Sequence, residues 1–432
     1  MTLENEMFDL LSELYPICRS ITGNGVRKSL KIIQKYVDLE IHEVPTGTKV
    51  FDWVIPKEWN INDAYIIDPD GKKILDFQKS NLHVVQYSKP INTKLKLDEL
   101  KSHIYSISKQ PENIPYVTSY YKETWGFCMS YNQFQNLPSG EYEICIDSNL
   151  SEGNLTYGEF LHKGKTEDEI LTSCYVCHPS MCNDNLSGVT LTTFLAKNMQ
   201  STNYSYRFLF IPETIGAITW LALNEEKISK IKHGLVATCV GDNGNLTYKK
   251  SRQGNAEIDH AACYVLQNSN EEHNITEFDP SLGSDERQFC SPGFNLPIGS
   301  LMRTPYLEFS EYHTSSDNLE FVKKEKLEDT YKKYISIYDI LENNKKYVNL
   351  NPKCEPQLSK RGLYHDIHII LDLETKDKFL LESAILWILN LSDGKNSLLD
   401  IAIKSNIKFS IIKSAIDSLK NCGLVKEFNE IM

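Results

Sequence analysis

Residues 170–188 read ILTSCYVCHPSMCNDNLSG, and this stretch decides the fold. It begins with the apolar run 170–176, continues through a polar turn and leads into a helical pattern at 189–199. Short apolar runs recur at 207–211 and 235–240, again separated by helical segments. This alternation is typical of parallel strands that helices bury on both faces. We therefore expect an α/β fold with a mixed, mostly parallel sheet and helices on both faces.

The composition is that of a folded, acidic protein. Of the 432 residues, 41% are hydrophobic and 24% are charged, which excludes wholesale disorder. Lys and Arg number 46 against 58 Asp and Glu, and the net charge of −12 has the wrong sign for a general nucleic-acid binder. The N-terminus lacks a secretory pattern, no run approaches the roughly 18 apolar residues of a membrane span, and the 11 scattered cysteines favour reduced thiols. We expect a cytoplasmic protein that does not enter a membrane.

Changes in the hydrophobic pattern along the sequence predict the domain boundaries. Short alternating runs and turns, among them the turn signal at 68–71, predict an inserted and mainly β segment. Its aromatic residues are expected to form mostly its own core: Trp53, Trp59, Tyr116, Tyr120, Tyr121, Trp125 and Phe127. The expected organisation is an α/β domain from 1–42 and 150–345, a mainly β insertion at 43–149, a linker at 346–361 and a small domain at 362–432.

The small C-terminal domain has the pattern of a winged helix-turn-helix. Helical spacing at 379–391, 398–405 and 409–422 precedes a candidate wing strand. Its third helix would be the recognition helix, but it offers only Lys413 and Lys420 as cations. This disfavours nucleic-acid binding and favours a homo-oligomer or protein contact through this domain. A transcriptional regulator is the alternative, and a salt-dependent gel shift would decide.

Polar side chains follow the predicted strands. His178 comes after the first apolar run, Glu213 after the second and Asp242 after the third. His313 follows a last candidate strand at 306–309. In open parallel sheets, sites form in the crevice beyond the carboxyl ends of the strands. Two histidines with carboxylates suit zinc or another divalent hydrolytic metal, so we expect a metal site at this edge.

The turn at 183–188 supplies a further carboxylate, Asp184. Asn185 or Ser187 could cap the helix that follows, and capping alone would also explain the turn. Residues 174–178 match the CxxCH pattern of haem attachment. We favour buried structural thiols there, because the cysteines continue an apolar strand.

Taken together, these motifs resemble the co-catalytic zinc exopeptidases, the fold of bacterial zinc aminopeptidases and of glutamate carboxypeptidase. The matching pieces occur in the family's order: His178, Asn183-Asp184-Asn185-x-Ser187-Gly188, Glu213-x-x-Gly216, Val240-Gly241-Asp242 and Tyr312-His313-Thr314-x-x-Asp317. Two further pieces look like its accessory motifs: Ser284-Asp285-x-x-x-Phe289, and Thr22-Gly23 with Arg27. More narrowly, the layout is similar to bacterial proteins with an aminopeptidase-like domain, a β insertion and a C-terminal winged helix. That resemblance covers nearly the whole chain.

The resemblance implies a set of metal ligands. Asp184 would bridge two metals. His178 and Asp242 would complete one site, and His313 would belong to the other. In most relatives a second glutamate follows the general base and binds metal, but Thr214 stands there in this chain. We therefore expect one tightly bound zinc ion and a second that is weak or absent.

The resemblance also implies the catalytic groups. Glu213 would be the general base, and Tyr312 would donate a hydrogen bond to the developing oxyanion. A carboxylate that normally follows the first histidine by two residues is replaced by Ser180, so the group that usually orients that histidine is missing. Glu286 or Glu311 could stand in for the missing metal ligand.

These expectations add up to a metal-dependent exopeptidase, with an aminopeptidase favoured, acting on a peptide or small amide substrate. Glu286 and Arg303 are the candidates for binding the charged ends of that substrate. A metal-depleted pseudoenzyme or ligand-binding scaffold is one alternative, favoured by Thr214 and Ser180 and opposed by the intact Glu213. An amidase or deacylase acting on amino-sugar amides is another, because the same water and base would serve any amide.

Overall fold

The computed structural model of the chain describes residues 2–363 and 373–428. These residues fall into two compact units, one ending at Tyr334 and the other beginning at Ile335. Each unit is described by itself. None of the described helices is both long and apolar enough to cross a membrane.

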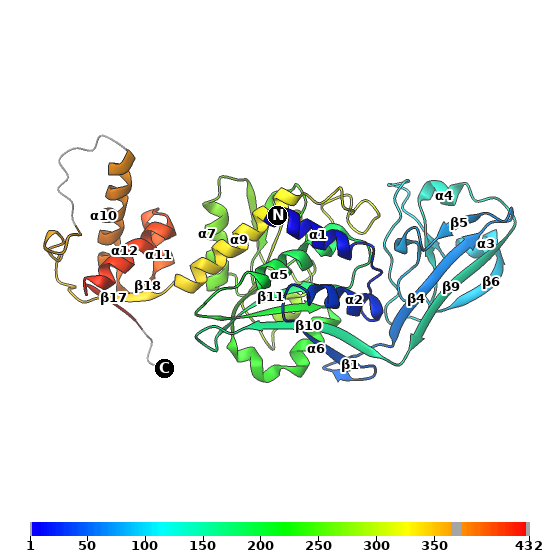
Figure 1. Cartoon of the computed structure of the whole chain (residues 1–432), viewed down its shortest axis with the longest axis horizontal. Coiled ribbons are helices and arrows are strands. Elements are labelled where there is room, and N and C mark those ends of the chain that lie inside the picture. Colours follow the sequence, from blue (N-terminus) through cyan, green and yellow to red (C-terminus); the bar gives the residue numbers. More distant parts are fainter. Residues whose placement is uncertain (1, 364–372, 429–432) are drawn as a thin grey trace. The chain divides into compact units, whose positions relative to one another are not determined.

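The first unit is built on an eight-stranded sheet in the order β1-β10-β12-β11-β13-β16-β14-β15 (Figure 1). The strands are β1 (Glu40–Pro45), β10 (Asn154–His162), β11 (Glu169–Tyr175), β12 (Ser205–Ile211), β13 (Ile231–Ala237), β14 (Leu246–Lys249), β15 (His273–Thr276) and β16 (Ile298–Met302). The central strands β12, β11, β13 and β16 run parallel, and antiparallel pairs flank them. The expected mixed, mostly parallel sheet is therefore confirmed.

Helices cover the sheet because its central strands are apolar on both faces. Every residue of β11 and β12 is buried. The helices of this unit include α1 (Leu3–Leu14), α2 (Asn24–Ile33), α5 (Gly188–Lys197), α6 (Ile215–Leu223) and α7 (Glu257–Gln267). In Figure 1, α1 and α5 lie above the sheet and α6 lies below it. The loops after β11 and β12 lead directly into α5 and α6, so both carry residues to the same sheet edge.

The strand expected at 306–309 is not formed, which corrects the sequence-based assignment. Residues 306–312 make turns, in which the amide of Glu308 donates to the carbonyl of Pro305 at 3.1 Å. The strand that pairs with β13 is β16, which ends at Met302. Proline has no backbone N–H for a ladder bond and favours a turn, which explains why the apolar stretch after it does not extend the sheet.

The segment between β1 and β10 forms a second, four-stranded antiparallel sheet in the order β5-β4-β9-β6. Its strands are β4 (Glu58–Ile67), β5 (Lys73–Asp76), β6 (Ile91–Lys96) and β9 (Glu141–Ser151). The predicted turn at 68–71 joins β4 to β5. Of the aromatic residues expected to form the insertion's core, Trp125 and Phe127 pack there. Trp59 packs in a different core cluster, with residues of the large sheet, and Trp53 and Tyr121 are exposed. Tyr116 and Tyr120 also lie outside this core, and they are described with the site below.

The second unit is a winged helix. Its helices are α10 (Leu373–Leu391), α11 (Leu398–Ser405) and α12 (Phe409–Asn421), and its sheet has the order β18-β17-β19. The strands are β17 (Lys346–Asn349), β18 (Asp393–Ser397) and β19 (Val425–Glu427). The residues expected to form a linker, 346–361, therefore begin with the central strand of this sheet. Tyr347 is buried there, which anchors the strand to the helices.

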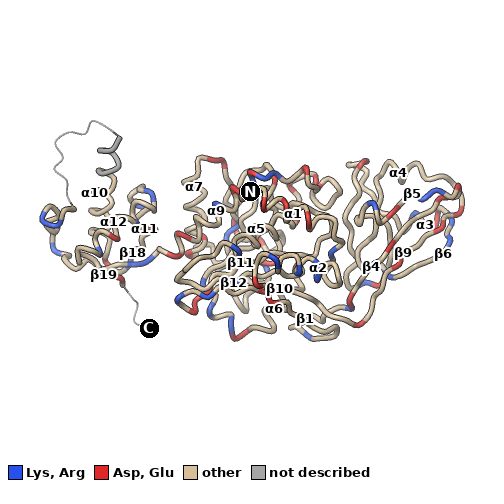
Figure 2. Tube along the Cα trace, viewed as in Figure 1, with Lys and Arg blue, Asp and Glu red and all other residues tan. Residues whose placement is uncertain are grey.

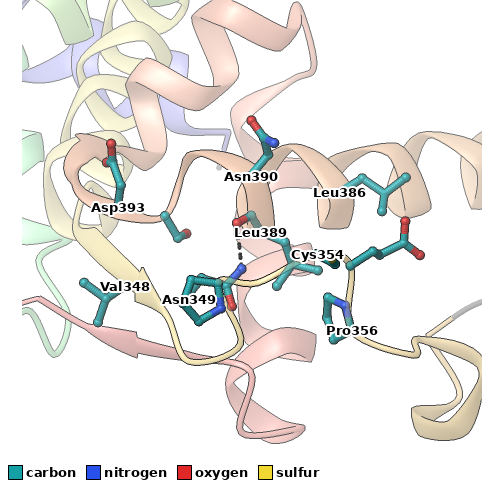
Figure 3. Close-up of a pocket in the computed structure, with 11 residues that line it drawn as sticks. Val348, Asn349, Cys354, Pro356, Leu386, Leu389, Asn390 and Asp393 are labelled. Atoms are coloured by element: carbon teal, nitrogen blue, oxygen red, sulfur yellow. Dashed lines mark hydrogen bonds between the residues drawn. The ribbon is translucent and has the colours of Figure 1, made fainter.

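A cavity of about 730 Å³ lies within this second unit, between the segment after β17 and the end of α10 (Figure 3). Val348, Pro356 and Leu389 supply apolar walls, and Asn349 donates a hydrogen bond to the carbonyl of Leu389 at 2.8 Å. Neither group of potential metal ligands found among the described residues lies in this lining, and both groups belong to the first unit.

Candidate active site

Three side chains from separate loops converge at the carboxyl edge of the large sheet. His178 follows β11, Asp184 lies in the turn before α5, and His313 lies in the turns after β16. Nε2 of His178 is 3.8 Å from Oδ2 of Asp184, and Nε2 of His313 is 3.0 Å from the same oxygen. The three potential ligand atoms lie within 4.8 Å of one another. Two imidazoles and one carboxylate are a ligand set that zinc accepts.

The hydrogen bonding of this cluster fits a bound cation. Oδ2 of Asp184 and Nε2 of His313 are buried, and neither has a hydrogen-bond partner among the described residues. Asp184 as a whole is 1% exposed. A buried carboxylate oxygen with no partner is costly unless a cation or a donor neutralises it. The residues present therefore fit a divalent metal held by His178, Asp184 and His313.

The protonation states are those that metal binding needs. Burial lowers the pKa of His178 to about 4, although the negative charge of Asp184 opposes this shift. Burial alone would raise the pKa of Asp184, but the nearby His178 and His313, with a hydrogen bond from Tyr175, lower it to about 2. At neutral pH His178 is therefore neutral and Asp184 is ionised. A metal ligand has to be deprotonated in this way.

Glu213 lies beside the three-residue cluster. It follows β12, and its Oε2 is 3.9 Å from Nε2 of His178. Burial, and then the negative charge of Asp184, raise the pKa of Glu213 to about 7. Its side chain is still 27% exposed, so water and substrate can reach it. A carboxylate with a pKa near the working pH is suited to general-base chemistry.

Cys177 packs against the same carboxylate. Its sulfur accepts a hydrogen bond from the amide of Glu213 at 3.2 Å, and with His178 and Glu213 it forms a second group of potential metal ligands. Burial raises the pKa of the Cys177 thiol well above its ordinary value, so it is protonated. The thiol was expected to be buried and structural, and its burial agrees. Its place beside the site was not visible in the sequence.

Two aspartates hold the loops of the site through backbone amides. The carboxylate of Asp317 accepts from the amides of Asn183 at 2.6 Å and of Asp184 at 2.9 Å, which fixes the turn that carries Asp184. The carboxylate of Asp285 accepts from the amide of Thr214 at 2.7 Å. Both aspartates stand in the motifs quoted from the sequence, which was the signal that could have identified these roles.

Tyr175 is a site residue that the sequence reasoning missed. Its hydroxyl donates to Oδ1 of Asp184 and lies 2.7 Å from Oγ1 of Thr238. Both Tyr175 and Thr238 are fully buried. The tyrosine occupies one oxygen of Asp184 and leaves the other turned toward the histidines. Because Tyr175 is one of several apolar residues in a buried strand, nothing in its sequence context distinguishes it.

The structure does not bring Asp242 to the cluster. β13 ends at Ala237, and the carboxylate of Asp242 is engaged by donors from its own turn and from two other segments. It accepts hydrogen bonds from the side chain of Asn183 at 2.9 Å, the amide of Gly244 at 2.6 Å and the hydroxyl of Thr304 at 2.6 Å. Asp242 belongs to neither group of potential metal ligands among the described residues. Its position shapes the loop instead.

The residues expected to bind substrate are engaged elsewhere. Glu286 is fully buried and forms an ion pair with Lys249, whose Nζ is 2.9 Å from Oε1 of Glu286. Arg303 is 1% exposed, and one of its guanidinium nitrogens lies 2.5 Å from Oδ2 of Asp329. Neither they nor Glu311 belong to the groups of potential metal ligands among the described residues. Burial in ion pairs explains why Glu286 and Arg303 are not free for a substrate.

Aromatic rings enclose the two histidines. The ring of Tyr312 stacks on that of His313, with centroids 4.0 Å apart and planes at 12°. The ring of Tyr116 has its centroid 5.1 Å from that of His178 and 5.0 Å from that of His313. Tyr116 comes from the β insertion, and its hydroxyl is 2.8 Å from that of Tyr120. The insertion therefore contributes to the wall of the site as well as to its own core.

Comparisons with known proteins agree with this architecture. The family model described as "Domain of unknown function (DUF4910)" matches residues 8–344, and a winged helix-turn-helix model matches residues 345–427. A protein of Clostridium acetobutylicum described as "Putative polysaccharide biosynthesis protein with aminopeptidase-like domain" is 55% identical, over 98% of this chain and 96% of its own length.

Solved structures extend the likeness to zinc aminopeptidases. The crystal structure of a putative peptidase from Clostridium acetobutylicum is 54% identical, covers 98% of this chain and 96% of its own, and has a TM-score of 0.92. The zinc aminopeptidase BSAP of Bacillus subtilis shares the fold at 12% identity, with a TM-score of 0.57 over 78% of this chain and 94% of its own. The chain thus belongs to the family described as "Domain of unknown function (DUF4910)", and it combines an aminopeptidase-like fold with a C-terminal winged helix.

Proposed function

We propose that the protein is a zinc-dependent hydrolase of peptide or amide bonds, and specifically an aminopeptidase. The observation that carries this proposal is the unpartnered Oδ2 of Asp184, which faces the Nε2 atoms of His178 and His313 beside Glu213. The aminopeptidase-like fold supports it, because the cluster lies at the edge of the sheet where α/β proteins place their sites.

We propose a single zinc ion held by His178, Asp184 and His313. Three protein ligands with an open fourth position are typical of catalytic zinc, whereas structural zinc is closed by four. This set differs from the one that the resemblance implies, because the carboxylate of Asp242 accepts hydrogen bonds from Asn183, Gly244 and Thr304 instead. Thr214, in the position of a further ligand, supports one ion over two.

The side chains of the site have separate roles in the proposed reaction. A zinc ion held there supplies Lewis acidity, which polarises an amide carbonyl and lowers the pKa of water. Glu213 takes a proton from the attacking water at its carboxylate and returns it to the departing amine nitrogen. The hydroxyl of Tyr312 donates a hydrogen bond to the oxygen on which negative charge develops. Tyr175 holds Asp184 in place throughout.

The test combines metal content with hydrolysis. Purified protein is analysed for zinc beside Asp184→Asn, His313→Ala and Glu213→Gln, and each is assayed on aminoacyl anilides. About one zinc per chain in the wild type and in Glu213→Gln, with hydrolysis lost in all three variants, supports the proposal. No zinc in the wild type after reconstitution contradicts it and favours a ligand-binding scaffold. Full activity of Glu213→Gln would remove the glutamate as base.

An amidase or deacylase acting on amino-sugar amides is a second candidate, favoured by a specific surface feature. Trp53 is 39% exposed and Tyr121 is 52% exposed, and their rings meet edge-to-face with centroids 5.5 Å apart. Exposed aromatic rings offer a face on which a sugar ring can pack while its hydroxyls stay in water. The name of the Clostridium acetobutylicum relative, which mentions polysaccharide biosynthesis, is consistent with such a substrate. Cleavage of N-acyl glucosamines but not of aminoacyl anilides would favour this candidate.

For the winged helix we propose a protein contact, such as self-association, over nucleic-acid binding. The two cations of α12 are already paired, because Lys413 lies 2.7 Å from Asp339 and Lys420 lies 3.7 Å from Asp417. Figure 2 shows acidic and basic residues interspersed along both units. A helix that reads DNA needs free cations for the phosphates. Sedimentation of the full chain tests the self-association.

A further inference from the structure

The β insertion is fastened directly to the loop that carries His313. The amide of Tyr116 donates to the carbonyl of His313 at 2.8 Å. The amide of Ser315 donates to the carbonyl of Ile114 at 2.9 Å, and the amide of Ile114 donates back to the hydroxyl of Ser315 at 3.0 Å. A short stretch of the insertion therefore runs alongside the His313 loop, as an added strand would. These hydrogen bonds fix the position of Tyr116 relative to His313.

This fastening brings a pair of tyrosine hydroxyls to the site. Tyr116 is buried, with its ring against both histidines, and Tyr120 is half-buried. The two hydroxyl oxygens are 2.8 Å apart and form one hydrogen bond. The ring of Tyr116 has its centroid 5.1 Å from that of His178, and Nε2 of His178 is 3.9 Å from Oε2 of Glu213. The imidazole of His178 thus contacts both Tyr116 and the proposed general base.

Counting hydrogens shows that this pair has a donor to spare. Two tyrosines carry two hydroxyl hydrogens, and their mutual bond uses one of them. Among the described residues neither hydroxyl makes another hydrogen bond. Each hydroxyl carries its hydrogen at neutral pH, because the ordinary pKa of tyrosine is about 10. The spare hydrogen is therefore available to an acceptor atom of a ligand that enters the site.

We propose that the insertion completes the active site and that the Tyr116–Tyr120 pair donates a hydrogen bond to an acceptor oxygen of the substrate. This rests on the proposed function, because it concerns how the same site holds an amide substrate. The pair complements the rest of the site, where Asp184 and Glu213 offer acceptors. The acceptor is a carbonyl oxygen in a peptide or a hydroxyl oxygen in an amino sugar. An ammonium group cannot accept the spare hydrogen, because it has no lone pair.

The test removes the hydroxyls and keeps the rings. Tyr116→Phe, Tyr120→Phe and the double variant are compared with the wild type for kcat/KM, zinc per chain and melting temperature. Tyr105→Phe is the matched control, since this tyrosine lies in the same insertion and is 42% exposed. Aminoacyl anilides and N-acyl glucosamines are both assayed, which separates a carbonyl acceptor from a sugar hydroxyl. Each single variant retains one hydroxyl, so the double variant is decisive.

We expect the double variant to lose about tenfold in kcat/KM on one of the two substrate classes, the size of one hydrogen bond. Zinc content and melting temperature stay at the wild-type values, and Tyr105→Phe is unchanged. Unchanged kcat/KM in the double variant, with an active wild type, overturns the role of the pair and leaves the hydrolase standing. Loss of zinc in the double variant also overturns it, because the pair would then only support the histidines. A zinc-loaded wild type that cleaves neither class overturns the proposed function, and this inference with it.

Discussion

Nε2 of His313 lies 3.0 Å from Oδ2 of Asp184, and neither atom has a hydrogen-bond partner among the described residues. The two residues are far apart in the chain and meet because one precedes α5 while the other follows β16. A carboxylate and an imidazole that face each other in this way are arranged for a shared cation. Several measurable consequences follow from this arrangement and from the packing around it.

Replacing Asp184 by Asn is expected to abolish zinc binding. The amide has lost the negative charge that the cation needs, and it offers one oxygen in place of two. Equilibrium dialysis against zinc, with metal analysis of the retained protein, measures the effect. We expect a loss of affinity of at least about a hundredfold. Wild-type affinity in this variant would show that the metal, if any, is held elsewhere.

Replacing Asp242 by Asn is expected to leave zinc binding intact and to lower stability. Its carboxylate accepts from the side chain of Asn183, the amide of Gly244 and both the amide and the hydroxyl of Thr304. The variant therefore weakens four hydrogen bonds without replacing a candidate ligand. We expect a loss of about 1–3 kcal/mol in the free energy of unfolding. Denaturant unfolding and dialysis of the same preparation separate the two effects. A variant that loses zinc but keeps the wild-type free energy of unfolding would show that Asp242 is a metal ligand.

A buried ion-pair cluster in the sheet makes a strong stability prediction. Arg207 on β12 makes two hydrogen bonds of 2.6 Å to Glu169, contacts Glu159 on β10, and is 4% exposed. Arg207→Met leaves two buried carboxylates uncompensated, which costs about 3–5 kcal/mol. Lys35→Ala is the control. Lys35 forms an ion pair with Glu13, and the two side chains are 60% and 42% exposed, respectively. Such an exposed pair contributes about 0–1 kcal/mol. Equal destabilisation of both variants would contradict the prediction.

The pH dependence of stability should include a contribution from Glu58. Hydrogen bonds from Arg27, at 2.6 and 2.7 Å, lower the pKa of Glu58 from 4.5 to about 2. Because the pKa is lower in the folded state, this contribution is complete above about pH 4.5 and is lost as the pH falls toward 2. Glu58→Gln should therefore be less stable than the wild type at pH 7, with the difference shrinking toward pH 2. Thermal unfolding across this range measures it, and a constant difference would refute the assignment.

The winged helix is expected to bind duplex DNA only weakly. With Lys413 and Lys420 paired, α12 presents no free cation to the phosphates among the described residues of that helix. Fluorescence anisotropy of a labelled random duplex should show no saturable binding by the full chain at about 100 mM salt. Tight binding that weakens steeply with salt would show that cations outside α12 hold DNA.

The parts of this fold that a single sequence could reveal are those with local signals. Buried strands such as β11 and β12 are continuous apolar runs, and the polar residues His178 and Glu213 mark the points where they end. The strand predicted at 306–309 is wrong because the apolar run after Pro305 has the composition of a strand but forms hydrogen-bonded turns. The first four residues of the expected linker form β17, which is short and pairs only with distant strands, so no local pattern marks it.

The candidate metal ligands were harder to predict, because their positions depend on where each strand ends. The apolar run at 235–240 continues beyond the end of β13 at Ala237, so Asp242 was assigned to the sheet edge although it lies in the next turn. Tyr175 and Tyr116 touch the site through contacts between distant segments. No local pattern distinguishes a buried tyrosine that orients a ligand from one that fills a core.

The bonds between Ile114, Tyr116 and the His313 loop join segments that are synthesised at different times. The insertion lies between β1 and β10, whereas His313 comes more than 150 residues after the start of β10. The nascent chain therefore contains the insertion long before its partner loop exists. Contacts between residues so far apart in sequence require the closure of a long loop, which slows folding. The two parts of the candidate site can meet only after the His313 loop has been synthesised.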